Sequence, residues 1–271
     1  MTASLFDLQA THEPHRWRLP ITEAVSVGRV DACFLFGGAG LAAGVTALER
    51  TCGRPVIWAT AQYLSFARPP SIMDLDVRVP ALGQLTTQAK VTGHVGDQEI
   101  LAVNAALGDR PGLTDSQWSV APAAPRPEAC RPALGGRGEV AGIHQHLTIR
   151  IALGRYRTEP VDTDRTDGRL LLWMQPRQGV AIDAAMLAIM ADFLPSGVIN
   201  ATGDPSVIAK SLDNTIRYAG LEPTGWVLCD IQIESLHRGF AHGAMRMYSE
   251  GGKLMAIASQ SMIIRRRKRG G

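Results

Sequence analysis

Two stretches of the chain are apolar on nearly every side. They run from Gly37 to about Arg50 and from about Ile182 to Leu194. A surface helix normally keeps one polar face, so this pattern predicts two helices that are buried in the core. The first stretch is also rich in glycine and alanine, which permits close approach of a neighbouring backbone.

Each helical stretch is followed by segments that alternate apolar and polar residues. Such alternation, together with many valines, isoleucines and threonines, is typical of strands with one buried face. Gly96 with Asp97, and Gly251 with Gly252, are residue pairs that tight hairpin turns require. The predicted strands cover about 55–67, 72–80, 84–95 and 98–107 in the first half, and 206–218, 226–237, 239–249 and 253–265 in the second.

The periodicity is lost in the middle of the chain. Residues 110–143 are dominated by proline, glycine and alanine, which is typical of a linker. We therefore predict an N-terminal domain over 1–112, a linker over 113–143 and a C-terminal domain over 144–271.

The two halves repeat one another weakly. The pattern of 55–68 resembles that of 206–219, and 96–108 resembles 250–262. One helix followed by a run of antiparallel strands, twice, predicts an α+β protein. A long central helix wrapped by a curved antiparallel sheet is the hot-dog arrangement, so the chain is expected to be a double hot-dog.

The composition is that of a soluble globular protein, because the 271 residues are 45% hydrophobic and 20% charged. The net charge is +3, but the basic run at 265–269 leaves the rest of the chain slightly acidic. We interpret that run as a solvated tail, with contact to an anionic ligand or lipid as the alternative. No nucleic-acid surface, signal peptide or membrane span is indicated.

Cysteines and histidines give no metal-binding pattern. The four cysteines lack a C-x-x-C spacing and suit a reducing cytoplasm, where we expect the protein to reside. His144 and His146 would share one face of a strand, but no carboxylate or cysteine pattern supports them as ligands. We expect no metal and no cofactor. The cysteines are Cys33, Cys52, Cys130 and Cys229.

Four polar residues stand inside apolar segments of the second half. Asp192 ends the helical stretch, Ser211 and Asp213 lie on one predicted strand, and Gln260 lies on the last strand. A carboxylate, a hydroxyl and a carboxamide on separate elements can converge on one water molecule, which favours a hydrolase. Neither a G-x-S-x-G nucleophile elbow nor a P-loop occurs in the chain.

In this combination the chain resembles the double hot-dog acyl-CoA thioesterases of the acyl-CoA thioesterase II type. The resemblance implies hydrolysis of an acyl-CoA, in fatty acid metabolism, with coenzyme A entering only as part of the substrate. Hot-dog sheets commonly pair edge to edge, so a homodimer or higher homo-oligomer is expected. The resemblance spans nearly the whole chain and rests on 34–44, 63–70 and 96–108, and on 186–197, 210–220 and 251–265.

The family uses an aspartate near the end of its second helix, a hydroxyl on the next strand and a glutamine on the last strand. Asp192, Ser211 and Gln260 match those positions, and Asp213 is interpreted as a supporting residue. Ser211 replaces the usual threonine; it keeps the hydroxyl and loses a methyl that restricts the rotamer. The resemblance implies that Asp192 activates a water as general base, without a covalent intermediate.

The carbonyl oxygen of a thioester needs hydrogen-bond donors that are fixed in advance. We expect them at the start of the first helix, where backbone N–H groups are free and Gly37 and Gly38 allow a ligand to approach. The internal repeat places Ala106 opposite Gln260 and Ala47 near the position of the aspartate. One hydrolytic site per chain is therefore expected.

Two other functions fit the same elements. A hot-dog hydratase or dehydratase acting on an enoyl-CoA typically needs a histidine with its aspartate, and 186–197 and 206–218 contain none. A non-catalytic acyl-CoA binding protein is the other alternative, and only kinetic measurements can distinguish it from a thioesterase. Three arginines are candidates for the phosphates of coenzyme A: Arg217, Arg238 and Arg265.

Overall fold

A computed structural model of the chain describes residues 5–133, 142–156 and 167–267. Lys268 and Arg269 of the basic run, and part of the predicted linker, lie outside these ranges. Within the described ranges every predicted strand segment is present, but the single strand predicted over 206–218 is divided at Leu212 into two, and two helices lie in the core.

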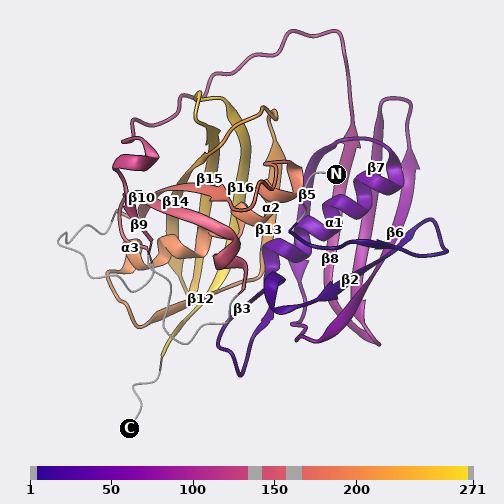
Figure 1. Cartoon of the computed structure of the whole chain (residues 1–271), viewed down its shortest axis with the longest axis horizontal. Helices are drawn as coiled ribbons and strands as arrows, with labels where there is room; N and C mark the ends of the chain where they lie inside the picture. The colour runs from indigo at the N-terminus through magenta and orange to yellow at the C-terminus, as the bar shows by residue number, and fades with distance from the viewer. Residues whose placement is uncertain (1–4, 134–141, 157–166, 268–271) are drawn as a thin grey trace.

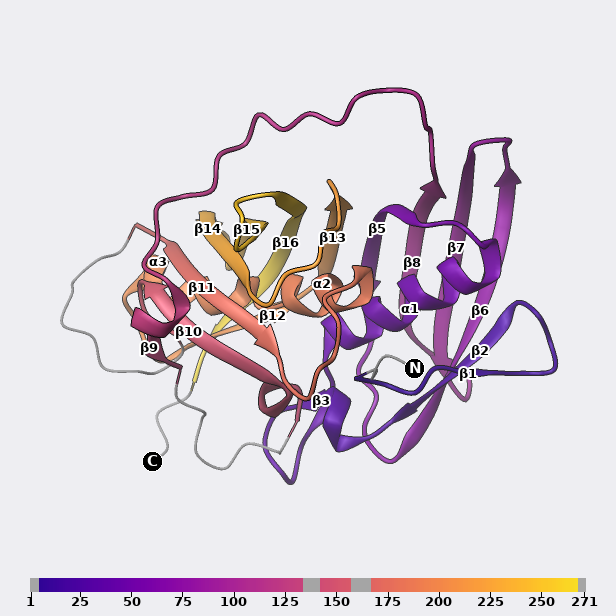
Figure 2. The same ribbon diagram turned by 45° about the horizontal axis from the view of Figure 1, so that its top comes forward.

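The strands of both halves join into a single antiparallel sheet (Figures 1 and 2). Its order is β1-β2-β6-β7-β8-β5-β13-β16-β15-β14-β11-β10-β9, and β12 pairs with β16 beside this path. The strands of the first half are β1 (Gln9–Ala10), β2 (Arg16–Ile21), β5 (Val56–Tyr63), β6 (Ser71–Leu82), β7 (Thr86–Val95) and β8 (Gln98–Gly108). Those of the second are β9 (Arg131–Pro132), β10 (Leu147–Leu153), β11 (Arg169–Pro176), β12 (Val207–Ser211), β13 (Asp213–Tyr218), β14 (Val227–His237), β15 (Phe240–Ser249) and β16 (Leu254–Arg266). A small separate sheet pairs β3 (Ser26–Val27) with β4 (Phe34–Leu35).

The two halves meet where β5 pairs with β13. In this register Thr60 lies opposite Thr215, and their hydroxyl oxygens are 2.6 Å apart. The inner faces of the two halves are therefore continuous, so a residue of β5 can reach a site carried by the second half.

The first core helix, α1 (Gly37–Cys52), is buried along most of its length. It packs against β5, β6, β7 and β8, which curve around it (Figure 1). Its small residues allow this contact, because a Cβ on Gly44 would come within 3.0 Å of Val103. The helix ends at Gly53, whose φ of +64° is the left-handed conformation that favours glycine.

The second core helix is shorter than the sequence predicted. Helix α2 covers Ala184–Ala191, with Asp183 as its N-cap and Asp192 as its C-cap. The prediction that the apolar helix ends at the Asp192 carboxylate is confirmed, but its extension to Leu194 is wrong. Leu194 precedes a proline, and such a residue is disfavoured in the α conformation. The chain continues instead as a 3-10 helix, η4 (Leu194–Gly197), and as α3 (Val198–Thr202).

The stretch Ala184–Thr202 is long and apolar enough to cross a membrane by length and composition alone. However, 72% of its most apolar window is buried inside the protein. Burial in the core therefore accounts for its apolar character.

Five strands of the main sheet were missed by the sequence pattern, the two-residue strands β1 and β9 and the longer strands β2, β10 and β11. Strand β11 is buried on both faces over most of its length, so it lacks the alternation that marks a half-exposed strand. His144 and His146 do not lie on a strand either. They belong to the 3-10 helix η3 (Ile143–His146), which precedes β10.

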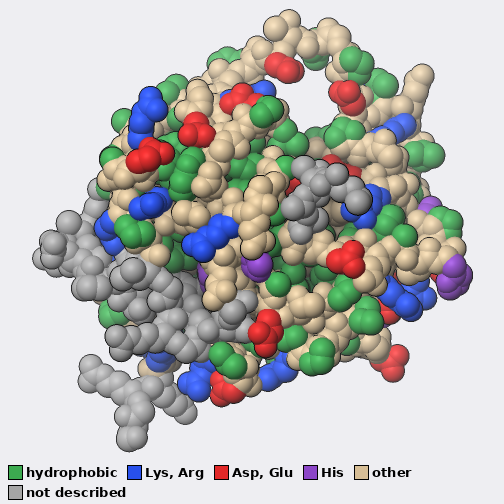
Figure 3. All heavy atoms as spheres, viewed as in Figure 1, with side chains coloured by type: hydrophobic (Ala, Val, Ile, Leu, Met, Phe, Trp, Pro, Cys, Tyr) green, Lys and Arg blue, Asp and Glu red, His purple; other side chains and the backbone are tan. Residues whose placement is uncertain are grey.

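Part of the predicted linker packs against the second half. It arches away from β8 and leaves open space beneath it before it meets the second half (Figures 1 and 3). Gln117 then bonds the backbone of Gly252 and Leu254, and the indole of Trp173 donates to the carbonyl of Pro125 at 2.9 Å. The short elements η2 (Pro127–Ala129) and β9 follow.

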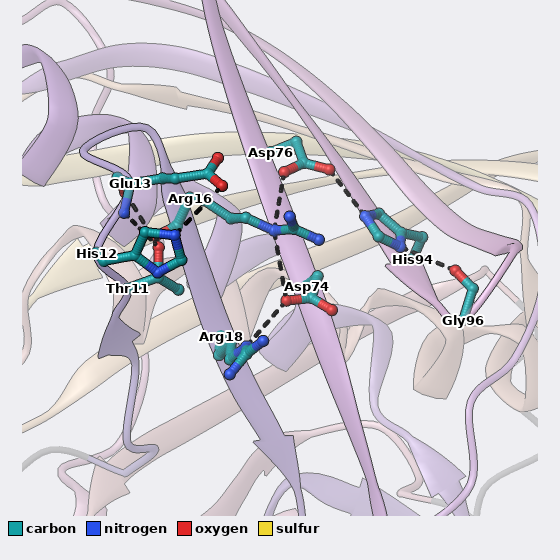
Figure 4. A network of polar contacts seen from close by, with 9 residues as sticks. All are labelled: Thr11, His12, Glu13, Arg16, Arg18, Asp74, Asp76, His94 and Gly96. Atoms are coloured by element: carbon teal, nitrogen blue, oxygen red, sulfur yellow. Dashed lines mark hydrogen bonds and ion pairs between the residues drawn. The ribbon is translucent and has the colours of Figure 1, made fainter.

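A charged network covers the outer face of β2, β6 and β7 (Figure 4). Arg16 and Arg18 of β2 face Asp74 and Asp76 of β6. His94 of β7 completes the network through a 2.8 Å contact with Asp76. These charges lie on the side of the sheet away from α1.

Candidate active site

Asp192 is the centre of the polar residues that the sequence singled out. It is only 7% exposed, at the point where the end of α2 meets the start of α1. Its Oδ2 accepts the N–H of Gly38 at 2.7 Å, and its Oδ1 accepts the hydroxyl of Ser211 at 3.1 Å. The carboxamide nitrogen of Gln260 also donates to Oδ1. The structure therefore brings Asp192 together with Gly38, Ser211 and Gln260.

The close approach of the two helices explains the glycines at the start of α1. A Cβ on Gly38 would lie 2.8 Å from the carbonyl oxygen of Ile189 and 2.9 Å from the Cβ of Asp192. A Cβ on Gly37 would lie 2.8 Å from Oδ2 of Asp192. No side chain fits at either position, so the backbone of α1 itself contacts the carboxylate.

Ser211 reaches the site because its strand is interrupted. Strand β12 ends at Ser211 and β13 begins at Asp213, with Leu212 between them. The break is held by the last strand, since the N–H of Ser261 donates to Oδ1 of Asp213 at 2.7 Å and its carbonyl accepts from Leu212 at 2.8 Å. Asp213 thus braces the strands, and no hydrogen bond joins it to Asp192 among the described residues.

Gln260 ties the hydroxyl and the carboxylate together. It is 2% exposed on the inner face of β16. Its Nε2 donates to Ser211 Oγ at 3.2 Å as well as to Asp192. Its Oε1 is buried and has no hydrogen-bond partner among the described residues. An acceptor is therefore left beside the carboxylate.

Burial raises the pKa of Asp192 from its ordinary value of 3.8 to about 6. The hydrogen bonds from Gln260, Gly38 and Ser211 act in the opposite direction and limit the rise. A carboxylate with this pKa is ionised near neutral pH and is a stronger base than an exposed aspartate. The site therefore combines a poised base with donors that orient it.

Two further residues of the site were missed as candidates in the sequence. Tyr63 of β5 has its hydroxyl buried next to Gly37, and Asn214 of β13 is completely buried. A signal for Asn214 existed, because it is an amide at an inward position of an alternating strand. Tyr63 carried no such signal, since an aromatic residue is ordinary in a strand.

The candidates for coenzyme A phosphates lie elsewhere. Arg217 is on the outer face of β13, and Arg238 is in the turn between β14 and β15. Arg265 lines a surface hollow of about 510 Å³ that also contacts α3, β12 and the end of β14. The turn at Arg238 adjoins this hollow, because the carbonyl of Gly239 accepts the N–H of Ile264. Within the described residues, no group of histidine, cysteine and carboxylate side chains is arranged to hold a metal.

Comparison with known proteins agrees with the thioesterase resemblance seen in the sequence. The sequence profile of the acyl-CoA thioesterase C-terminal domain matches residues 124–264. No curated protein matches the chain. A solved structure from Novosphingobium aromaticivorans, assigned to the thioesterases, is 33% identical; the match covers 94% of this chain and 97% of that one, with a TM-score of 0.85.

Two more distant structures share the fold. Acyl-CoA thioesterase II TesB2 from Mycobacterium marinum is 19% identical over 97% of both chains, with a TM-score of 0.72. A protein of unknown function with a hot-dog fold from Alicyclobacillus acidocaldarius is 16% identical over 97% of both chains, with a TM-score of 0.81.

The fold is a double hot-dog in which two core helices meet at a buried carboxylate, and the family match identifies the protein as a thioester hydrolase. The chain belongs to the acyl-CoA thioesterase family.

Proposed function

We propose that the protein hydrolyses an acyl-CoA to a free acid and coenzyme A through a water that Asp192 activates, with no covalent intermediate. The observation that carries this proposal is the buried carboxylate with a pKa of about 6, held by Gly38, Ser211 and Gln260. These partners are donors, so they orient the carboxylate and lower its basicity only in part, because burial still holds its pKa at about 6.

The attacking water is held by two acceptors. It donates one hydrogen to the carboxylate of Asp192 and the other to the unpaired Oε1 of Gln260. Its lone pair then faces the thioester carbonyl carbon. As the new C–O bond forms, the water proton moves to Asp192 and negative charge develops on the carbonyl oxygen. Collapse of this intermediate breaks the C–S bond, and protonated Asp192 returns its proton to the leaving thiolate.

The start of α1 supplies positive potential for the carbonyl oxygen. The N–H of Gly38 is already bonded to Asp192. We therefore assign the N–H of Gly37, one residue earlier, as a donor to the oxyanion. A donor of this kind is typically worth about 3 kcal/mol of the activation barrier.

The phosphates of coenzyme A fit best near Arg265. Val207 lies opposite Arg266 and Ser211 opposite Met262, so the hollow is four residues along β12 from the site. At about 3.3 Å per residue this is roughly 13 Å, which an extended pantetheine arm can span. Arg266 also lines the hollow, where it pairs with Asp204 at 3.3 Å, and the carboxylates of Asp167 and Glu234 lie in the same lining. Arg238 adds a further positive charge in the adjoining turn.

The decisive experiment measures free-thiol release from acyl-CoA esters of several chain lengths. Asp192→Asn is expected to lower kcat by about 10²-fold or more, as loss of a general base does. Equal turnover by the variant would refute the role of Asp192. Absence of turnover with tight acyl-CoA binding would favour a binding protein, and water addition to an enoyl-CoA would favour a hydratase.

The arginine assignment has its own control. Arg265→Ala should raise KM for an acyl-CoA but leave KM unchanged for the same acyl group on N-acetylcysteamine, which lacks phosphates. Arg217→Ala is the matched control, because that side chain lies on the outer face of β13. A KM increase with both thioesters would refute a phosphate contact.

The remaining expectations complete the proposal. The reaction as written uses neither a metal nor a cofactor, and we place it in fatty acid metabolism in the cytoplasm. A homodimer or higher homo-oligomer is the expected assembly. Sedimentation of the purified protein tests the oligomeric state.

A further inference from the structure

A group of buried polar atoms near Asp192 has no hydrogen-bond partner among the described residues. They are the hydroxyl of Tyr63, both polar atoms of the Asn214 carboxamide, and Oε1 of Gln260. Buried polar groups are nearly always paired within a folded protein. Three neighbouring residues with unpaired atoms therefore indicate a place where a ligand supplies the missing partners.

The three side chains share one face of the sheet. Asn214 of β13 lies opposite Ala61 of β5, and Tyr63 is two residues further along β5, so it points to the same side. On the other flank, Thr215 lies opposite Ser259, which places Gln260 beside Asn214 on the inner face of β16. The group thus crosses the seam between the two halves and faces α1 and α2.

The hydroxyl of Tyr63 lies next to the start of α1. A Cβ built on Gly37 would be 3.1 Å from this hydroxyl oxygen and 2.8 Å from Oδ2 of Asp192. The backbone of Gly37 is therefore enclosed between the phenol and the carboxylate. The phenol therefore lies beside the residue whose N–H is assigned to the oxyanion.

Tyr63 is a neutral donor rather than a base. Burial, followed by the negative charge of Asp192, raises the pKa of Tyr63 well above its ordinary value. The nearby Asn214 carboxamide opposes this rise, although the pair does not meet hydrogen-bond geometry. The phenol is therefore protonated near neutral pH.

We propose that Tyr63 is a further catalytic residue, whose hydroxyl donates to the thioester carbonyl oxygen alongside the N–H of Gly37. Asn214 is a positioning residue: as the substrate carbonyl binds, its Nδ2–H closes on the phenol oxygen, donates a hydrogen bond to it and turns the phenol hydrogen toward the substrate. This inference rests on the proposed hydrolysis at Asp192. In the step itself, the carbonyl π electrons move to the oxygen as water attacks, and the phenol shares its hydrogen without losing it. The electron pair returns when the C–S bond breaks.

The test compares Tyr63→Phe with the wild type under thiol-release kinetics. Loss of one oxyanion donor should lower kcat about 10²–10³-fold, with KM changed by less than about threefold. The thermal midpoint should not fall, because the hydroxyl that is removed makes no hydrogen bond within the described protein. A structural role would give the opposite result, with a lower midpoint and an unchanged kcat.

Tyr218→Phe is the matched control. Its hydroxyl is also buried, but it donates to the carbonyl of Ala184 at 2.9 Å. Removing this hydroxyl should lower the thermal midpoint and leave kcat within about twofold. The two tyrosines thus separate a catalytic hydroxyl from a structural one.

The role of Asn214 is tested in two backgrounds. Asn214→Ala should lower kcat about tenfold in the wild type but cause no further loss in Tyr63→Phe, because residues that act as a unit are not additive. Full additivity would overturn the positioning role of Asn214.

The outcomes separate this inference from the proposed function. Wild-type kcat in Tyr63→Phe, with an inactive Asp192→Asn, overturns the role of Tyr63 and leaves the hydrolysis standing. Wild-type activity in Asp192→Asn overturns the mechanism itself, and the role of Tyr63 falls with it.

Discussion

Replacing Asp192 with asparagine should make the protein more stable at neutral pH while it abolishes turnover. The folded protein holds this carboxyl at a pKa of about 6, against an ordinary value of 3.8. The folded state therefore binds the proton more tightly than the unfolded chain, and ionisation of Asp192 opposes folding. The penalty is absent below pH 3.8, grows as the pH rises to about 6, and is constant above that.

The size of the penalty follows from the pKa shift. A shift of roughly two pKa units corresponds to about 3 kcal/mol. Asparagine can form hydrogen bonds with the same partners if the Gln260 carboxamide rotates by about 180° and exchanges the positions of its oxygen and nitrogen. Its Oδ1 then accepts from Gly38, and its Nδ2 donates to the oxygens of Gln260 and Ser211. The variant should recover most of the penalty, which for a chain of this size is roughly 6–12 °C in Tm.

Urea unfolding at pH 5 and pH 8 measures the effect. The gain in unfolding free energy should be about 1 kcal/mol larger at pH 8 than at pH 5, because the ionised fraction of Asp192 rises between them. Asp183→Asn is the control, since Asp183 is an exposed N-cap at the other end of α2 and asparagine also caps helices. Its effect should stay within about 0.5 kcal/mol. A gain in Asp192→Asn that does not change with pH, or a loss, would refute a buried ionised carboxylate.

The other predictions concern the same site and the charged network. The kcat/KM should fall as the pH drops through about 6, since protonated Asp192 cannot act as a base; a profile that is flat between pH 5 and 8 contradicts this. Ser211→Ala should lower kcat while Ser211→Thr keeps it, and steady-state kinetics distinguishes a hydroxyl requirement from a steric one. Gly38→Ala should lower both kcat and Tm, because its Cβ would meet a carbonyl of α2 at 2.8 Å; an unchanged Tm in a melting scan would show that the helices can separate. Burial is the largest single influence on the pKa of His94 and lowers it, but the hydrogen bonds to Asp76 and Gly96 and the charges of Asp76 and Asp74 together outweigh burial, so the net shift is upward. His94→Gln should therefore lower the unfolding free energy at pH 5 and have little effect at pH 9, where His94 is neutral in both the folded and the unfolded protein. Urea titrations at both pH values test this.

Many elements of the fold can be predicted from the pattern of apolar and polar residues along the chain. The half-buried strands are predicted by their alternation of apolar and polar residues, and α1 is predicted by an apolar stretch that ends at Gly53. Strand β11 escaped prediction because both of its faces are buried, so no alternation remains. The end of α2 at Asp192 was indicated by the carboxylate that closes the apolar stretch, whereas the predicted extension to Leu194 was wrong, since the residue before a proline is constrained.

Only part of the site could be predicted from the sequence, because local patterns identify buried polar residues but not their mutual positions. Asp192, Ser211 and Gln260 stood out because each is polar inside an apolar segment. Their mutual geometry depends on the break at Leu212, which lets Ser211 turn inward and which no sequence signal marks. The use of the Gly38 N–H by Asp192 likewise follows from packing between helices 154 residues apart.

The sequence by itself determined which segments form strands and core helices, and which polar residues are buried among apolar ones, because these properties depend on neighbours along the chain. Only the tertiary structure decided that β5 pairs with β13. That pairing carries Tyr63 from the first half into the site of Asp192, and it is set by packing between distant segments rather than by any local pattern.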